Sequence, residues 1–259
     1  MQHGYARVVA AIAVVIIWVG ITVNFGRQWS TAKHPIDQGL STGFSWPIFS
    51  AGVFLIIALV VFRWRDVGLN RPLPHTWKLA WFPAVFIGLF LVIGCLLGLP
   101  PVSILFVMLI NSLLIGWSEE LAFRGILFSA FRARFRLWLA IGLTCVAFGS
   151  VHILNGFTTG DFGGALVQAG ATAVSGLLFA ALVIRTGSIF PAMVVHALWD
   201  YSAFVMLASM RAGGGADVAP PADSLSLANI VLPFALELPN FLYALYLLRG
   251  SRSALARAA

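Results

Sequence analysis

The chain has 259 residues, of which 60% are hydrophobic and only 10% are charged, and its mean hydropathy is +0.96. Soluble domains carry about 25% charged residues, so this composition excludes a soluble globular protein. The formal net charge is +7, but the basic residues cluster in short loops and form no basic surface interleaved with aromatic residues. Nucleic acid is therefore not an expected partner.

Apolar runs long enough to cross a lipid bilayer follow one another along the chain. In chain order they cover about residues 8–25, 44–62, 79–98, 102–130, 137–154, 163–184, 189–210 and 225–248. Because the first run has no small-residue cleavage site and seven more follow it, we treat it as a retained helix rather than a secretory signal. The sequence predicts an all-α fold, a polytopic bundle of about eight transmembrane helices, in a single membrane-embedded domain over residues 1–259.

Basic residues are divided unequally between the two ends of such a bundle. One side holds Arg7, Arg63, Arg65, Arg71, Lys78, Arg132, Arg134, Arg136, Arg185, Arg249, Arg252 and Arg257, and the other holds Arg27, Lys33 and Arg211. Cytoplasmic loops of membrane proteins are enriched in lysine and arginine, so we expect both termini in the cytoplasm. The many alanines, glycines and arginines beside only two lysines favour the plasma membrane of a bacterium.

The fourth run contains two of the chain's three glutamates side by side, in the segment SEELAFRG. Ionisable residues within a bilayer cost about 2.5–3.5 kcal/mol each on insertion scales, so each is a functional candidate. Glu120 and Arg124 are four residues apart and can pair on one helix face, whereas Glu119 lies about 100° around the helix. We expect Arg124 to hold Glu120 and to leave Glu119 free for chemistry. The alternative is a salt-bridged helix end facing cytoplasmic water.

The fifth and seventh runs each carry a histidine. CVAFGSVHIL places Phe148 one turn before His152, and HALWD places His196 one turn before Asp200. The carboxyl group of Asp200 can orient the His196 ring, or it can stay protonated and donate a hydrogen bond. The alternatives are a packing histidine at 152 and a self-satisfied polar pair at 196 and 200.

Depth in the membrane relates these side chains to one another. At 1.5 Å per helical residue, Glu119, His152 and His196 lie about 12–22 Å from the nearest basic loop, in the central part of a hydrocarbon core about 30 Å thick. A shared depth predicts one water-accessible cavity, which we expect to open toward the cytoplasm.

Two glutamates and two histidines in one cavity are suited to general acid–base catalysis on a water molecule. Glu119, helped by His152, could take a proton from a water that attacks a carbonyl, while His196 and Asp200 donate hydrogen bonds to the developing oxyanion. The same residue types could hold a divalent metal, but there is no HExxH and the spacing does not decide. Ser118 does not complete the GxSG pattern of a serine intramembrane protease.

Three motifs occur in order along the chain: EELAFR matches EExxxR, FGSVH matches FxxxH, and HALWD matches HxxxN/D. Together they resemble the CPBP (ABI) family, which includes type II CAAX prenyl endopeptidases and bacteriocin-processing enzymes. The likeness covers about residues 100–205, the expected catalytic core. It implies a metal-independent, glutamate-dependent intramembrane endopeptidase without a cofactor, which cuts a membrane-associated peptide or protein.

The resemblance also implies roles for individual residues. Glu119 would be the general base, with His152 as its partner on the attacking water. His196 and Asp200 would form the oxyanion site, and Glu120 with Arg124 would support the architecture. The prenyl-protease branch has asparagine where this chain has Asp200, and an ionised aspartate cannot donate to an oxyanion. Asp200 must then be protonated or orient His196, and a prenylated CAAX substrate is the part of the resemblance that this departure weakens.

Two other functions fit the same residues. A non-catalytic member would bind a peptide, or confer immunity to a bacteriocin, in the same polar cavity without cutting its ligand. A proton-coupled transporter would also use buried glutamate and histidine. Its best support is Glu237 between Pro233 and Pro239 in the last run, since broken helices line transport sites. The sequence contains no detectable inverted repeat, which counts against transport.

Overall fold

A computed structural model describes residues 2–27, 36–212 and 226–249 of the chain, and these residues form helices and connecting turns without a strand. The long helices are α1 (Gln2–Arg27), α3 (Trp46–Phe62), α4 (Trp81–Leu97), α5 (Val102–Glu120), α7 (Leu137–Val151), α9 (Phe162–Thr186), α10 (Phe190–Ala212) and α11 (Leu227–Leu248). Short helices connect them: α2 (Ile36–Ser41), η1 (Thr76–Ala80), η2 (Leu121–Leu127), α6 (Phe128–Arg132), η3 (His152–Leu154) and α8 (Asn155–Thr159).

Each predicted apolar run corresponds to one of these long helical stretches. Seven stretches among the described residues are long and apolar enough to cross a membrane, and α3, with 17 residues, is slightly shorter. A helix of about 17 residues is at the lower end of the length that spans a bilayer. The predicted all-α polytopic bundle is therefore confirmed.

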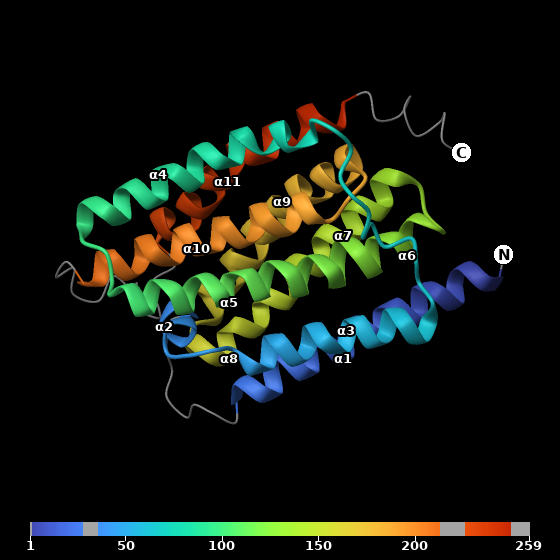
Figure 1. Ribbon diagram of the computed structural model, residues 1–259, viewed down its shortest axis with the longest axis horizontal. Helices are drawn as coiled ribbons and strands as arrows, with labels where there is room; N and C mark the ends of the chain where they lie inside the picture. The colour runs from blue at the N-terminus through green and yellow to red at the C-terminus, as the bar shows by residue number, and fades with distance from the viewer. Residues whose placement is uncertain (1, 28–35, 213–225, 250–259) are drawn as a thin grey trace.

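The helices lie side by side along the long axis of the molecule, with α5 and α10 in the middle (Figure 1). Helix α10 packs against α4, α5 and α9, and α9 in turn packs against α7 and α11. Helix α1 packs against α3 and η2. Among the motif-bearing helices, α5 therefore packs directly on α10, and α7 is joined to α10 through α9, which carries none of the motifs.

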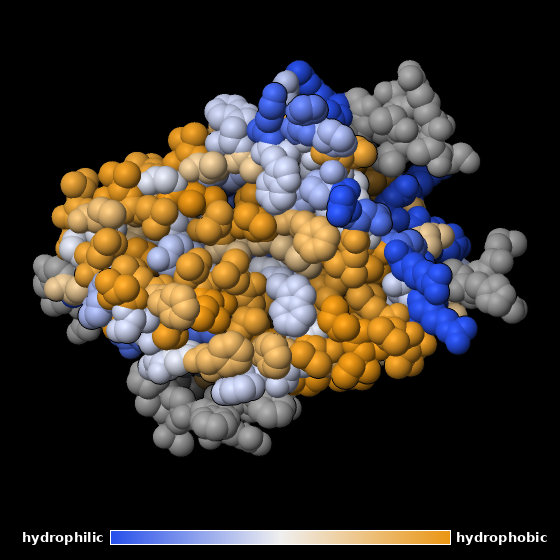
Figure 2. Space-filling model, viewed as in Figure 1, coloured by the Kyte–Doolittle hydropathy of each residue, from blue (hydrophilic) through white to orange (hydrophobic). Residues whose placement is uncertain are grey.

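Hydrophilic residues gather at one end of the bundle, where α1 begins and α11 ends, while apolar side chains cover most of the remaining visible surface (Figures 1 and 2). At this end Arg7 forms a salt bridge of 2.6 Å with Asp66, and its hydrogen bonds hold the pKa of that exposed carboxyl below its usual range. We call this the basic end. Lys33, Arg252, Arg257 and the side chain of Arg27 lie outside the described residues.

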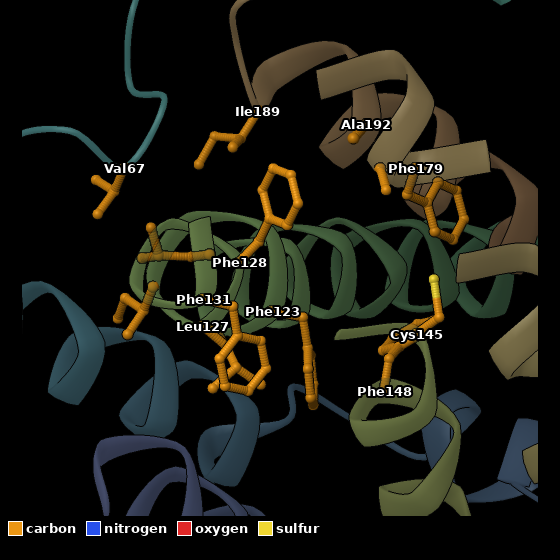
Figure 3. Packing of buried hydrophobic residues seen from close by; sticks show 14 of the residues in the cluster. Val67, Phe123, Leu127, Phe128, Phe131, Cys145, Phe148, Phe179, Ile189 and Ala192 are labelled. Carbon is orange, nitrogen blue, oxygen red and sulfur yellow. The ribbon is translucent and has the colours of Figure 1, made fainter. Parts of the chain in front are cut away.

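The sequence suggested that the fourth run is one continuous α-helix. The structure differs, because residues 121–127 form a π-helix between α5 and α6. All seven residues of this segment are buried. Figure 3 shows Phe128 turned toward Ile189 and Phe123 turned toward the side of Phe148, with the Phe123 and Phe148 ring centroids 5.1 Å apart. A π-turn adds a residue to the helical turn and is frequent at functional sites. Here it begins directly after Glu120.

Two glycines let the motif-bearing helices approach their neighbours closely. A Cβ atom on Gly116 of α5 would lie 2.6 Å from the carbonyl oxygen of Met193 on α10, and one on Gly149 of α7 would lie 2.4 Å from that of Ala169 on α9. Small residues at such crossings allow helix backbones to pack directly in a membrane. Glu119 follows Gly116 by three residues, and His152 follows Gly149 by three. Two close contacts between helix backbones therefore lie about one turn from the candidate catalytic residues.

Candidate active site

Glu120 lies at the centre of a buried hydrogen-bond network. Its Oε1 atom accepts hydrogen bonds from Arg124 Nη1 and from His196 Nδ1, each at 2.9 Å. The Nη2 group of Arg124 donates to the carbonyl oxygen of Gly176 on α9 at 3.1 Å. The side chains of Glu120 and Arg124 are fully buried. The expected pairing of these two residues is present, and it ties α5 to α9 and α10.

Aromatic rings surround the buried guanidinium group. The central carbon of Arg124 lies 4.0 Å from the ring centroid of Phe148 and 5.1 Å from that of Phe179. Phe179 also stacks on the His196 imidazole, with centroids 4.7 Å apart and planes 17° apart. A cation over aromatic faces gains electrostatic stabilisation, more so when it is desolvated. The rings thus stabilise the arginine and fix the plane of His196.

Glu119 has the different environment that its position on the helix predicts. Its side chain is 19% exposed and lines a cavity, and its Oε2 atom has no hydrogen-bond partner among the described residues. That same atom lies 3.9 Å from Nε2 of His196. Arg124 therefore holds Glu120 and leaves Glu119 as the carboxylate that faces the cavity.

His152 is positioned at the point where α7 ends and the 3-10 turn η3 begins. Its Nδ1 atom lies 2.9 Å from the carbonyl oxygen of Phe148, and the two rings meet edge to face with centroids 5.2 Å apart. A carbonyl oxygen only accepts hydrogen bonds, so Nδ1 carries the proton and, in the neutral ring, Nε2 is an acceptor. His152 lines the same cavity as Glu119.

Asp200 lies on the other side of the His196 ring from Glu120. Its Oδ2 atom is 3.5 Å from Nε2 of His196, and the side chain is 22% exposed at the cavity wall. The sequence left two roles open for Asp200, and orienting the ring was one of them. In the structure Glu120 binds the Nδ1 side of the ring, so Asp200 and Glu119 are the acids that face its Nε2 side.

The cavity has a volume of about 860 Å³. From Glu119 and His196 it extends to Leu40, Asn155 and Met210, at the end where the short helices α2 and α8 lie (Figure 1). This end is opposite the basic end. The cavity was expected to open toward the cytoplasm, the side to which the basic loops are assigned, but it extends away from the basic end. Which end faces the cytoplasm stays a prediction. The count of basic residues shows which loops lie together at one end of the bundle. It does not show at which end the packed helices leave an opening to the cavity.

Sequence reasoning missed three members of this region. Gly176 and Phe179 stand in an apolar stretch of α9 without a polar side chain to mark them, and only their contacts with Arg124 and His196 reveal them. Glu237 had been considered only as support for transport, yet it lines the same cavity. Ser118 is buried and accepts a hydrogen bond from the Trp18 indole at 2.7 Å, in keeping with a structural role.

Metal-ligating side chains are not gathered into a three-residue group anywhere in the part of the chain that the structure describes. Glu119, His196 and Asp200 approach one another through a single imidazole nitrogen, which is an ion-pair geometry rather than a converging ligand set. Independence from metal and cofactor stays a prediction.

Comparison with known proteins gives one match. Residues 101–202 match the family model described as type II CAAX prenyl endopeptidase Rce1-like. The resemblance that the three motifs indicate is thereby confirmed over this segment, and it points to a membrane-embedded protease. The seven candidate residues all fall within it: Glu119, Glu120, Arg124, Phe148, His152, His196 and Asp200. No curated protein matches the chain, and no solved structure matches it.

Proposed function

We propose that the chain is a glutamate-dependent intramembrane endopeptidase that hydrolyses a peptide bond of a membrane-associated peptide or protein. The observation that carries this proposal is the division of labour between adjacent glutamates. Glu120 is fully buried and pairs through Oε1 with Arg124 and His196, whereas Glu119 is partly exposed and faces the cavity that His152 also lines.

In the proposed reaction Glu119 accepts a proton from a water molecule that also donates to Nε2 of His152. The water oxygen forms a bond to the carbonyl carbon of the substrate, and the carbonyl oxygen becomes an oxyanion. The proton held by Glu119 then passes to the amide nitrogen as the carbon–nitrogen bond breaks, which leaves a carboxylic acid and an amine. Each proton and each bond is accounted for by water, substrate and this carboxylate.

The oxyanion would be stabilised by His196 and Asp200. Nδ1 of His196 donates to Glu120, so the ring must be the doubly protonated imidazolium for its Nε2–H to donate into the cavity. In the proposal His196 has this form, with Glu120 as its counter-ion. A protonated Asp200 would add a second donor beside it. Fixed donors in a site that excludes bulk water stabilise developing charge more than donors in water do, and removing one costs about 10²–10³ in kcat.

The side of the membrane from which substrate enters follows from two observations. Arginine and lysine gather at one end of the bundle, and cytoplasmic ends carry this excess. The cavity runs to the opposite end. We therefore propose that the termini are cytoplasmic and that the substrate enters from the non-cytoplasmic side. This direction, together with Asp200 in place of asparagine, favours an unprenylated peptide.

The test compares cells that produce wild-type protein with cells that produce Glu119→Gln, by proteomic identification of peptide ends in the membrane fraction. Cleavage events present with wild-type protein should disappear, because glutamine cannot accept the proton from water. Asp66→Asn is the matched control, since it removes an acid that lies outside the cavity, and it should retain cleavage. Wild-type cleavage by a Glu119→Gln protein with unchanged thermal unfolding would refute the role of this residue.

The peptide-binding alternative uses the same cavity and omits the chemistry. It predicts that Glu119→Gln and His152→Gln leave the cellular phenotype intact. The transporter alternative requires a path to both ends of the bundle, whereas the cavity extends from Glu119 and His196 toward the end where α2 and α8 lie.

A further inference from the structure

Glu237 is a buried carboxylate that the three motifs do not include and that lies outside the matched segment. Its side chain belongs to α11, it is 9% exposed, and its Oε2 atom has no hydrogen-bond partner in the described part of the chain. Its sequence neighbour Leu238 is 52% exposed, as expected for a helix that faces lipid. Glu237 instead lines the cavity. An acid in an apolar helix is costly to bury, so its direction into the cavity points to a ligand.

The cavity around Glu237 is strongly acidic. Its wall contains four carboxyl side chains, those of Glu119, Asp161, Asp200 and Glu237, and among the described residues that line it there is neither lysine nor arginine. The side chain of Arg124 is fully buried and does not line the cavity. The imidazoles of His152 and His196 are the only basic groups in the described wall, and His196 lies beside Glu119. When a cleft has low-dielectric walls that carry charges of one sign, the electrostatic field of those charges is concentrated within the cleft.

The position of the other acids separates Glu237 from the reaction. Glu119 and Asp200 face the imidazole of His196. Asp161 caps the first turn of α9, where its Oδ1 atom accepts a hydrogen bond of 2.8 Å from the Gly164 amide. Glu237 has neither of these roles. It also follows Pro233, which lines the same cavity, in a continuous helix that contains two prolines.

We infer that Glu237 is a subsite for a positively charged group of the substrate: a lysine or arginine side chain, or a free amino group, of a peptide whose scissile bond lies at Glu119. This inference rests on the proposed function and adds a substrate class to it. A cation beside Glu237 would compensate the negative charge of the carboxyl groups in the cavity wall and would stabilise the ionised carboxylate of Glu237. A peptide that placed its free carboxylate or an acidic side chain there would be repelled.

Binding of matched peptides tests the inference without turnover. The protein is Glu119→Gln in lipid nanodiscs, and the probes are fluorescent decapeptides of leucine and alanine that carry one lysine, norleucine or glutamate at each position in turn. Norleucine keeps the carbon chain of lysine and lacks the ammonium group. At one or more positions the lysine peptide should bind at least tenfold more tightly than the norleucine peptide, and the glutamate peptide should bind least tightly, as measured by fluorescence anisotropy.

Variants assign the preference to Glu237. Adding Glu237→Gln should abolish the difference between lysine and norleucine peptides, whereas Glu237→Asp, which keeps the charge, and Asp66→Asn, which removes an acid outside the cavity, should preserve it. Equal binding of lysine and norleucine at every position, or a preference that survives in a folded Glu237→Gln protein, would overturn the inference.

The two proposals fail in different ways. If wild-type protein cleaves no peptide, and the preference for lysine in binding still depends on Glu237, the proposal of hydrolysis is wrong and the subsite stands. If wild-type protein cleaves lysine and norleucine peptides equally well, hydrolysis stands and the subsite is wrong.

Discussion

At the scale of single residues, the site depends on how two adjacent glutamates are distinguished. Glu120 accepts hydrogen bonds from Arg124 and His196 with one oxygen, so its charge is compensated and its geometry is fixed. Breaking a buried pair by removing one partner costs about 3–5 kcal/mol, because the remaining charge is left uncompensated. Glu119 has no such partner and is available to react.

Asp200 gives the residue-scale prediction. Because Glu120 already orients the His196 ring, we expect position 200 to serve as a hydrogen-bond donor. Asp200→Asn should therefore retain at least about a tenth of wild-type turnover, whereas Asp200→Leu, which has no donor, should lose about 10²–10³ in kcat. Initial rates on one cleaved peptide measure both. Equal loss in the two variants would show that the carboxylate itself is required.

At the scale of elements, the candidate catalytic side chains lie next to close helix crossings. Gly149 brings α7 against α9 one turn before His152, and Gly116 brings α5 against α10 one turn before Glu119. The π-helix after Glu120 then buries Arg124 where it reaches Gly176 on α9. Placement of the acids and imidazoles is thus a property of helix contacts, in addition to the order of residues on each helix.

Two glycines of one helix test this view. Gly149→Ala would place a methyl group 2.4 Å from the Ala169 carbonyl, and overpacking of this kind costs about 1–3 kcal/mol. Gly142→Ala, also on α7, meets nothing within 4 Å and should be neutral or slightly stabilising. Thermal unfolding in detergent should show a lower Tm for the first variant alone, together with reduced turnover. Equal unfolding temperatures would mean that α7 moves freely away from α9.

At the scale of the whole molecule, the direction of the cavity relative to the membrane decides which substrates can enter. We propose from the charge distribution that the basic end lies in the cytoplasm, and the cavity extends to the other end. A substrate in this orientation approaches from outside the cytoplasm.

Labelling of single cysteines tests the orientation. In a protein whose Cys95 and Cys145 are replaced by serine and alanine, Thr42→Cys would mark the cavity end and Asn70→Cys would mark the basic end; both positions are exposed. A maleimide that does not cross membranes should label the first in intact cells and the second only after permeabilisation. The reverse pattern would place the cavity in the cytoplasm and refute the proposed side of entry.

The sequence by itself determined the helices and the local pairs. Hydropathy marks each span because every residue's transfer to lipid contributes independently, and a spacing of four residues is enough to place Arg124 against Glu120 and Phe148 beside His152. The three motifs likewise indicated the protease resemblance before any contact was known.

Only the tertiary structure decided which side chains from different helices meet. The bond between Glu120 and His196 joins residues 76 positions apart, and the inward direction of Glu237 depends on how α11 is rotated in the bundle. The cavity's direction depends on which helix ends pack tightly and which do not. These features arise from shape-dependent packing between distant segments, and the hydropathy of a segment says how readily it enters the membrane without saying which neighbour it will contact there.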